Sequence, residues 1–453
     1  MLKLEENKGI PRYLIIMMAI MAGVSVANLY YNQPLLELIR LEFSVTEVQA
    51  NLISVITQIG YATGLFLIIP MGDLYSRRMI ILISMLSAAV ASAIIGFAPS
   101  LILVWVASYF LGVCSVIPQL FIPIAGQFSS SENKARNMGY VLSGLLIGIL
   151  TARVVSGYVG NWLGWRAMFF IASVVMIISC LISVRVMPDM KSNFQGNYRS
   201  LMRSILKIIA AHPNIRLNSV RAAFGFGSML AVWSCLAFHL GQAPFYAGSN
   251  MVGMLGLCGI LGAVAASGIG KYIPQYGIGN FSITGAIIQI TGWVIAFFFG
   301  NSYPGLAISI ILIDVGLQCQ QLSNQSGCIQ EIPQASNRVN TIFMTTYFIG
   351  GSLGTFLAGW GWKLAEWTGV CAMGAGMAVI SLVISFLILN RFLILFVCVS
   401  TVFVYLSLSK VRAKNIILVL LFLIAFVYIF GLLGTWRMSN IMDVPYSQAQ
   451  DYI

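Results

Sequence analysis

Two charged residues interrupt long apolar stretches of this sequence and are its strongest candidates for chemistry. Arg153 lies within Gly148–Gly157 and Asp314 within Leu312–Gln318, both far from the ends of their apolar runs. A charge at the centre of a bilayer costs at least about 2.5–3.5 kcal/mol, so charges kept there usually serve a function. Burial and a neighbouring guanidinium act in opposite directions on the pKa of a carboxyl group. If the two side chains meet, a solute that binds Arg153 can move a proton on or off Asp314. The alternative is a structural charge pair that locks helices together.

The composition is that of an integral membrane protein. Of the 453 residues 59% are hydrophobic and 8% charged, with a mean hydropathy of +0.91, whereas soluble chains carry about a quarter charged residues. The net charge of +12 comes from basic residues scattered singly between apolar runs, which indicates loops facing an anionic leaflet and not a nucleic-acid surface. The eight cysteines are spread singly, there are only two histidines, and no Gly-Lys-Ser/Thr loop is present. We therefore expect no metal site and no nucleotide hydrolysis.

The apolar runs are long enough to cross a membrane, which takes about 20 residues each. They lie near residues 12–35, 46–71, 79–98, 101–125, 137–159, 166–187, 217–240, 250–273, 279–300, 304–324, 339–364 and 370–389. This pattern predicts an N-terminal tail (1–11), a first six-helix half (12–187), a basic linker (188–216) and a second six-helix half (217–389). Basic residues predominate in the linker and in the loops on its side, so the N-terminal tail and the linker are predicted to be cytoplasmic.

The last part of the chain, residues 390–453, is an atypical extension with two further apolar runs. Residues 392–408 and 416–430 form these runs, and Lys410, Arg412 and Lys414 separate them. If both runs crossed the membrane, the basic cluster would face outside, against the charge rule. Two extra membrane segments, an interfacial hairpin and an altered tail are the three interpretations that stay open.

A short loop between the second and third apolar runs concentrates charge. It extends from Pro70 to Arg78 and contains Gly72, Asp73 and Arg77. The arginines mark a cytoplasmic side, Gly72 is expected to allow a sharp turn, and Asp73 can accept hydrogen bonds from the N–H groups at the end of a neighbouring helix.

This loop resembles the loop between helices 2 and 3 of the major facilitator superfamily. Asp73, Arg77 and Arg78 fall in register with the family motif, whereas Ile69 and Ser76 replace two of its glycines. The Pro-x-Gly-Asp sequence, the Tyr-Tyr-Asn-Gln-Pro end of the first run and the Asp-x-Gly-x-Gln of the tenth run are similar to an efflux-type branch. The resemblance implies an all-α polytopic membrane protein with the 12-helix fold of two six-helix halves. It also implies that Gly72, Asp73, Arg77 and Arg78 form a gate.

The same resemblance implies a central cavity lined by helices 1, 4, 7 and 10, with Arg153 and Asp314 coupling charge movements. Polar and aromatic residues at that depth are the expected substrate contacts: Tyr31, Asn32, Gln33, Gln58, Gln119, Trp233, His239, Gln318 and Gln321. For any single one of them, interhelical hydrogen bonding is the alternative. Two features depart from the family pattern: Ser108 stands where many proton-driven members carry an arginine, and helix 5 lacks the Gly-Pro of many exporters.

The resemblance implies a secondary active transporter that exports a small organic compound by alternating access, driven by a proton gradient and without a cofactor. Uptake by symport is the alternative within the superfamily, and a polytopic membrane enzyme or sensor is the alternative outside it. The 13 acidic residues lie mostly in loops and no soluble output domain is present, so we predict no enzyme activity. The expected partners are the substrate and the lipid bilayer, for a monomer in the plasma or inner membrane that binds no nucleic acid.

Overall fold

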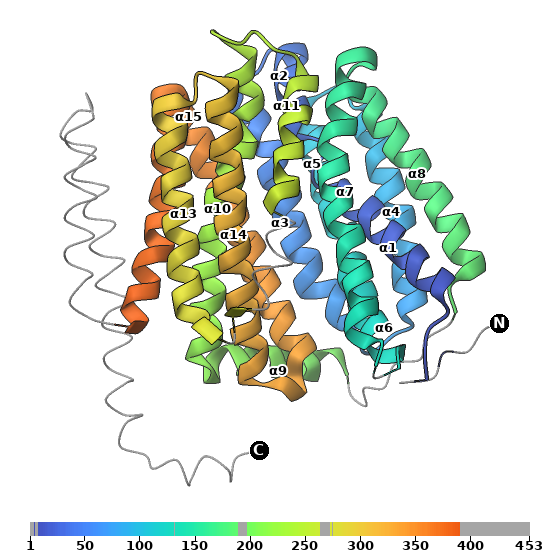
Figure 1. Ribbon diagram of the computed structural model, residues 1–453. Helices are drawn as coiled ribbons and strands as arrows, with labels where there is room; N and C mark the ends of the chain where they lie inside the picture. The colour runs from blue at the N-terminus through green and yellow to red at the C-terminus, as the bar shows by residue number, and fades with distance from the viewer. Residues whose placement is uncertain are drawn as a thin grey trace. The chain divides into compact units, whose positions relative to one another are not determined.

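Helices form the regular secondary structure of the described part of the chain. The computed structural model describes residues 4, 8–130, 132–188, 197–262, 272–273 and 275–389. Within these residues nine helices are long and apolar enough to cross a membrane, and Figure 1 shows long helices running side by side. The predicted all-α polytopic membrane fold is confirmed. The predicted extension over 390–453 lies outside the described residues.

The N-terminal helices, α1–α8, correspond in order to the first six predicted runs. They are α1 (Arg12–Ala27), η1 (Gln33–Leu35), α2 (Leu36–Phe43), α3 (Glu47–Met71), α4 (Arg77–Phe97), α5 (Leu101–Cys114), α6 (Pro118–Phe128), α7 (Lys134–Leu163) and α8 (Trp165–Val186). The first run (12–35) thus contains α1 and η1, α2 follows it as a short helix between the first two predicted runs, and the fourth run contains α5 and most of α6.

The C-terminal helices, α10–α15, correspond to the second six runs. They are α10 (Pro213–Gly241), α11 (Ser249–Leu255), η2 (Gly256–Cys258), α13 (Ile278–Phe299), α14 (Tyr303–Glu331), η3 (Pro333–Ala335) and α15 (Ser336–Leu389). The 54-residue α15 is two helices joined at a kink, because Ala365 (φ −155°, ψ 31°) and Glu366 (φ 48°, ψ −134°) leave the helical region. The two parts of α15 supply the eleventh and twelfth spans.

Two of the predicted continuous helices are broken near prolines. The first run is a helix only to Ala27, and Pro34 opens the 3₁₀ turn that leads into α2. The fourth run breaks between Cys114 and Pro118, which opens α6. Proline has no N–H to continue the hydrogen-bond ladder. The first break places Tyr30 in a turn and Gln33 at the start of the 3₁₀ helix η1, both inside the bundle.

Glycines let one helix of each set approach another closely. In α7, Gly144 and Gly148 face Gly23 of α1, and a Cβ on Gly23 would lie 2.6 Å from the Gly144 carbonyl oxygen. In α15, Gly350 faces Gly227 of α10, where a Cβ would lie 2.5 Å from the Gly350 oxygen. Small residues at helix crossings bring backbones into van der Waals contact. The same packing therefore occurs in both sets of helices.

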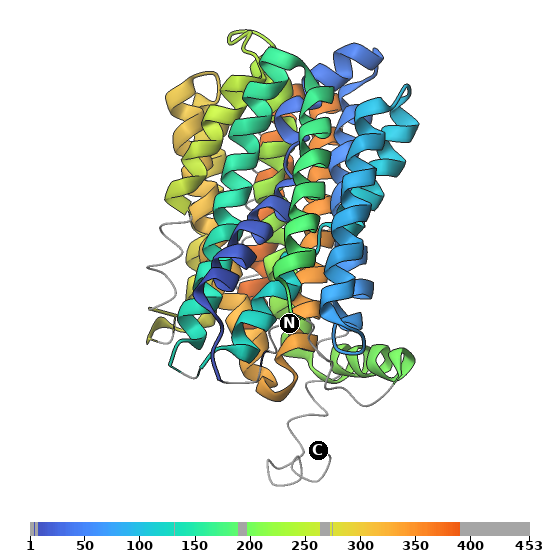
Figure 2. The same ribbon diagram turned by 90° about the vertical axis from the view of Figure 1, so that its right-hand side faces the viewer.

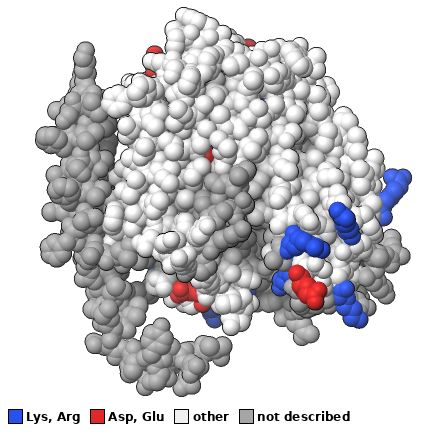
Figure 3. Space-filling model, in the orientation of Figure 1, with Lys and Arg blue, Asp and Glu red and all other residues white. Residues whose placement is uncertain are grey.

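The linker contains an amphipathic helix, α9 (Tyr198–Ala211), which lies across one end of the long helices in Figures 1 and 2. Its Tyr198 hydroxyl donates to the Leu67 carbonyl (3.0 Å), and Arg338 donates to Ser204 (3.1 Å), so α9 contacts both sets of helices. We call this the α9 end and the opposite one the α2 end. Among the described side chains on the face in Figure 3, the basic ones gather toward the α9 end, whereas the middle is uncharged over most of its area.

Direct contacts join the N-terminal helices to the C-terminal ones. From α3, Asn51 Nδ2 donates to the Thr355 carbonyl of α15 (2.7 Å) and Gln58 Nε2 to the Thr355 hydroxyl (3.3 Å). From α11, the Ser249 hydroxyl donates to the Gly157 carbonyl of α7 (2.8 Å). Asn51 lies near the start of α3 and Ser249 begins α11, so these contacts hold the two sets together toward the α2 end.

Candidate functional site

The Arg153 side chain is buried between the two sets of helices, with 3% of its surface exposed. Its Nε donates to Gln33 Oε1 (2.9 Å), and its guanidinium carbon lies 3.8 Å from the centroid of the Trp233 ring and 5.2 Å from that of Tyr30. A desolvated cation–π contact is worth about 2 kcal/mol. Gln33 and Tyr30 come from the break after α1 and Trp233 from α10, so Arg153 joins N-terminal to C-terminal helices.

Asp314 lies on α14 and is also buried, with 7% exposed. Two glycines after α11 leave room for its side chain: a Cβ on Gly259 would lie 3.1 Å from Oδ2, and one on Gly262 would lie 2.9 Å from the Asp314 Cβ. Asp314 interacts electrostatically with Arg153. No ion pair within 4.0 Å joins the two residues, both of which are described. The two predicted charges therefore interact, but they do not form a direct ion pair.

Aromatic residues that the sequence did not single out complete this cluster. Tyr347, from the first part of α15, interacts electrostatically with Asp314 and Tyr30, donates its hydroxyl proton to Gln321 (2.9 Å) and stacks on Phe226 of α10 at 4.0 Å. In an apolar run, the sequence does not distinguish an aromatic residue that lines a cavity from one that packs against a neighbouring helix. For this cluster the sequence offered one signal, the position of Tyr30 directly before the predicted contact Tyr31.

Several buried polar atoms in this region have no hydrogen-bond partner within the protein. They include Arg153 Nη2, Trp233 Nε1, Gln58 Oε1 and both amide atoms of Asn28. Leaving such a group unsatisfied costs about 1–3 kcal/mol, so native proteins usually pair it with a ligand or a water molecule. Two of these atoms, on Arg153 and Trp233, belong to side chains that stack on each other. The Arg153–Asp314 cluster is therefore the best candidate for a ligand site.

Other predicted cavity residues make different contacts. Asn32 bonds Thr57 (3.3 Å) and Ser54 (3.0 Å), which ties the break after α1 to α3 within the N-terminal helices. Gln119 interacts with Tyr61 and lines a cleft at the α9 end. Gln58 belongs to the α3–α15 contact, and Gln321 bonds Tyr347. Tyr31 is buried after α1, and Gln318 is half-buried one turn along α14 from Asp314.

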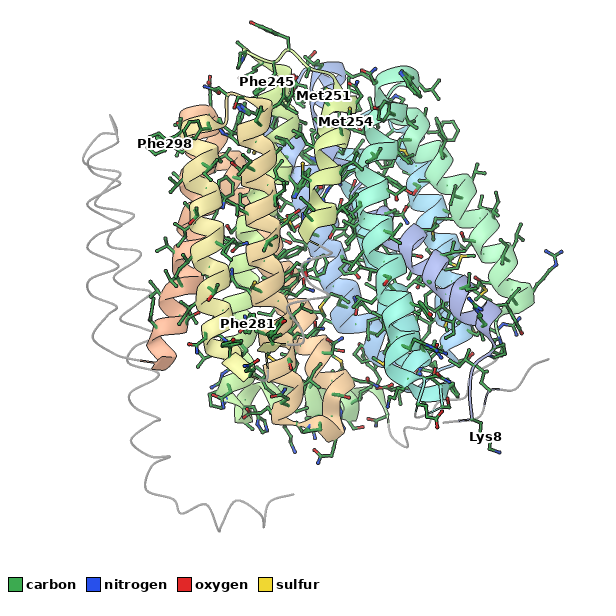
Figure 4. All side chains as sticks on the ribbon, in the orientation of Figure 1. Lys8, Phe245, Met251, Met254, Phe281 and Phe298 are labelled. Atoms are coloured by element: carbon green, nitrogen blue, oxygen red, sulfur yellow. The ribbon has the colours of Figure 1, made fainter. Side chains whose placement is uncertain are left out.

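His239 lies apart from the cluster. Its Nε2 is 2.9 Å from the Gly300 carbonyl oxygen, and its ring stacks on Trp367 at 4.1 Å and contacts Phe245 at 5.4 Å. Figure 4 shows Phe245 at the α2 end, opposite Lys8. His239 thus packs among aromatic residues at the α2 end of α10.

The loop before α4 lies beside the start of α15. Asp73 and Arg77 form an ion pair (3.4 Å), Arg77 also donates to Gln127 (2.8 Å), and Arg78 donates to the Val184 carbonyl (2.6 Å). Asp73 and Arg77 line a cleft with Asn337–Thr341, the first turns of α15. Burial raises the pKa of Asp73 above its ordinary value, although Arg77 and Arg338 act to lower it.

The expected reason for Gly72 was wrong. Its backbone is ordinary right-handed helix (φ −64°, ψ −14°), so no sharp turn requires glycine there. A Cβ would instead lie 2.8 Å from Leu120 Cδ2 of α6. Close packing of the loop against α6 explains the glycine.

These observations define a class of protein: a helical, multi-pass membrane protein with a buried polar cluster between two sets of helices. Its described residues hold no group of three or more His, Cys, Asp or Glu side chains that could bind a metal. A family model of the Major Facilitator Superfamily matches residues 18–355. The chain belongs to this superfamily of membrane transporters.

Relatives and solved structures agree with this assignment. The uncharacterized transporter YgaY of Escherichia coli O157:H7 is 33% identical over 380 residues, which cover 84% of this chain and 96% of the relative. The probable transporter SCO4007 of Streptomyces coelicolor is 27% identical over 365 residues, covering 80% and 85%.

Two crystal structures of transporters share the fold. The nucleoside transporter NupG has a TM-score of 0.67 at 12% identity and covers 83% of this chain and 99% of its own. A bacterial homologue of the lysosomal transporter Spinster, inward-facing and occupied, has a TM-score of 0.63 at 16% identity, covering 83% and 96%.

Proposed function

We propose that this transporter exports a small organic compound in exchange for protons, with Arg153 and Asp314 as the coupled charges of its substrate site. The observation that carries the proposal is their placement. Each is buried, each comes from a different set of helices, and they interact without forming an ion pair. A directly bonded pair would be stable with or without substrate, whereas two unpaired charges can respond to whatever binds between them.

Asp314 is the proposed proton carrier. The groups that act on it are Arg153 of α7, Tyr30 after α1, Trp233 of α10, Cys258 after α11 and Tyr347 of α15. Arg153 is the permanent charge among them, because an arginine side chain is not deprotonated in proteins. A substrate that weakens or strengthens the electrostatic interaction between Arg153 and the Asp314 carboxylate changes the proton affinity of Asp314.

Alternating access needs an interface between the two sets of helices that can open and close. The contacts of Asn51 and Gln58 with Thr355 support a closed α2 end. The cleft between Asp73 and the start of α15 supports a gate at the α9 end, formed by Gly72, Asp73, Arg77 and Arg78. The basic side chains at this end favour a cytoplasmic position for it, in the plasma or inner membrane.

The proposal can be tested by reconstituting the purified protein in liposomes and measuring movement of a mixed panel of organic solutes, with and without an imposed pH gradient. Gradient-dependent movement of a solute against the proton flow supports the proposal. Movement of a solute together with protons would replace export by uptake symport. Absence of any gradient-dependent movement in correctly inserted protein would overturn proton coupling.

A further inference from the structure

The chemistry around the two coupled charges carries an inference about the substrate, which rests on the proposed function. Arg153 has only part of its bonding capacity used. Its Nε bonds Gln33 and one face lies on Trp233, but its buried Nη2 has no partner. The indole Nε1 of the same Trp233 has no partner at hydrogen-bond distance, but it interacts with the Asp314 carboxyl group. Guanidinium edges with free N–H groups match the two oxygens of a carboxylate.

The Asp314 side of the cluster has the opposite preference. Its carboxylate is buried and makes no ion pair within the described residues. Tyr30, Tyr347 and Trp233 interact with it, but none of them carries a positive charge. A buried carboxylate without a cationic partner attracts an ammonium group strongly, because the site is desolvated. Gly259 packs closely beside Oδ2, where a Cβ would lie 3.1 Å from Oδ2 and 2.8 Å from Leu150 Cδ2, so a larger residue there would crowd the carboxylate.

From these two half-sites we infer that the substrate is a small zwitterion, with a carboxylate that binds Arg153 and a protonated amine that binds Asp314. A compound with only one of these charges would leave the other buried protein charge without a partner, which is costly in a low dielectric. The inference also accounts for the exchange of substrate for protons. The substrate amine and a proton compete for the same Asp314 carboxylate, so each excludes the other. The transporter therefore carries the substrate in one direction and a proton in the other.

The test uses four charge forms of the same scaffold and measures binding alone. The protein is purified in detergent, and its melting temperature is followed with each of the twenty amino acids, with taurine and with β-alanine. For those that stabilise it, affinity is compared with the amide (cation only), the N-acetyl acid (anion only) and the N-acetyl amide (neutral). The zwitterion is expected to bind about 10- to 100-fold more tightly than either singly charged form, as for loss of one charged hydrogen-bonded contact.

Two variants sharpen the test, with Gly376→Ala as a control because a Cβ there has nothing within 4 Å. In Arg153→Gln the amide should bind as well as the amino acid, and in Asp314→Asn the N-acetyl acid should do so. Equal affinity of zwitterion and singly charged forms in the wild type, or no stabilisation by any zwitterion, would overturn the inference. Binding without gradient-driven flux would leave the inference standing and refute the proposed function. Exchange of protons for a solute that carries only one charge would refute the inference and leave the proposed function standing.

Discussion

Among the described residues, two arginines are buried in the membrane-spanning helices, and they are bonded in different ways. Arg153 lies between the N-terminal and C-terminal helices with Nη2 unpaired. Arg221, 1% exposed on α10, lies within the C-terminal helices, where Nε donates to Asn324 Oδ1 (2.6 Å) and Nη2 to Asn218 Oδ1 (2.8 Å). Neither makes an ion pair within the described residues. The two buried cations therefore differ: Arg221 is bonded to neutral amide oxygens, whereas Arg153 has an incomplete set of hydrogen bonds.

The surroundings of Arg221 are a continuous hydrogen-bonded network. Ser381, in the second part of α15, donates to the Gln320 side-chain oxygen (2.5 Å) and also contacts the Arg221 carbonyl (3.0 Å). Gln320 in turn donates to Gln289 of α13 (2.6 Å). This network joins α10, α13, α14 and α15. A fully bonded polar network makes a core rigid, which favours a structural role for Arg221, whereas the unpaired Nη2 of Arg153 is what the proposed ligand-binding role requires.

The largest contrast is expected in transport. Arg153→Gln should reduce transport at least 100-fold, because the permanent charge of the proposed substrate site is lost, while the melting temperature changes little. Transport rate in liposomes and thermal unfolding in detergent would be measured on the same preparation. A variant that transports normally would place Arg153 outside the substrate site.

Arg221→Gln should show the opposite pattern. Its loss leaves the buried Asn324 without its donor, at a cost of about 1–3 kcal/mol, and the half-buried Asn218 loses its donor as well. Substrate affinity should stay near the wild-type value. Thermal unfolding and substrate binding provide the two readouts. Loss of affinity at unchanged stability would erase the distinction between the two arginines.

A smaller effect is expected at the gate. Asp73→Asn should slow the transport cycle several-fold with little change in substrate affinity, because Asp73 contacts Arg77 and the start of α15 and lies outside the Arg153–Asp314 cluster. Turnover and affinity measured separately decide this; a pure loss of affinity would contradict a gate role.

The same variant has a predictable pH dependence. Since burial raises the pKa of Asp73 in the folded protein, its ionised form costs stability at neutral pH, and that cost disappears as the pH falls through the raised pKa. Asp73→Asn should therefore melt no lower than the wild type at pH 7, and the difference should shrink toward pH 4. A melting temperature of Asp73→Asn that lies below that of the wild type at pH 7 but not at pH 4 would contradict this prediction.

The smallest effect is expected from filling space beside Asp314. Gly259→Ala adds a methyl group 2.8 Å from Leu150 Cδ2 and 3.1 Å from Oδ2 without changing any charge. The shift that this requires beside Asp314 should weaken substrate binding a few-fold. Gly376→Ala, in open space, is the matched control. Equal affinity in the two variants would show that the room beside Asp314 is not used by substrate.

The sequence predicted the parts of this site that break a pattern. Arg153 and Asp314 were recognisable because charges are costly within apolar runs, and hydropathy located the spans. Tyr347 was not recognisable, since an aromatic residue in an apolar run resembles ordinary packing. Arg221 was not predicted as a buried charge: it lies only four residues inside the expected run 217–240, where a charge resembles one that flanks a membrane span, whereas α10 begins at Pro213 and Arg221 is buried within it.

The breaks after Ala27 and Cys114 depended on Pro34 and Pro118, whose effect on a membrane helix is decided by the neighbours that satisfy the freed backbone groups. His239 and Gln58 were predicted from polarity and depth alone. Sequence spacing describes the direction of a side chain only approximately. In the structure His239 contacts the Gly300 carbonyl and Gln58 contacts Thr355.

The most direct test of the central claim compares proton movement in the wild type and Asp314→Asn, reconstituted in liposomes with a transported solute on one side and a pH-sensitive dye inside. The account predicts that solute movement drives proton flux in the opposite direction in the wild type. In Asp314→Asn the protein stays folded, solute–solute exchange persists at solute concentrations high enough to offset the lost contact with the carboxylate, and proton flux is abolished. Undiminished proton flux in Asp314→Asn would contradict the role of this carboxylate.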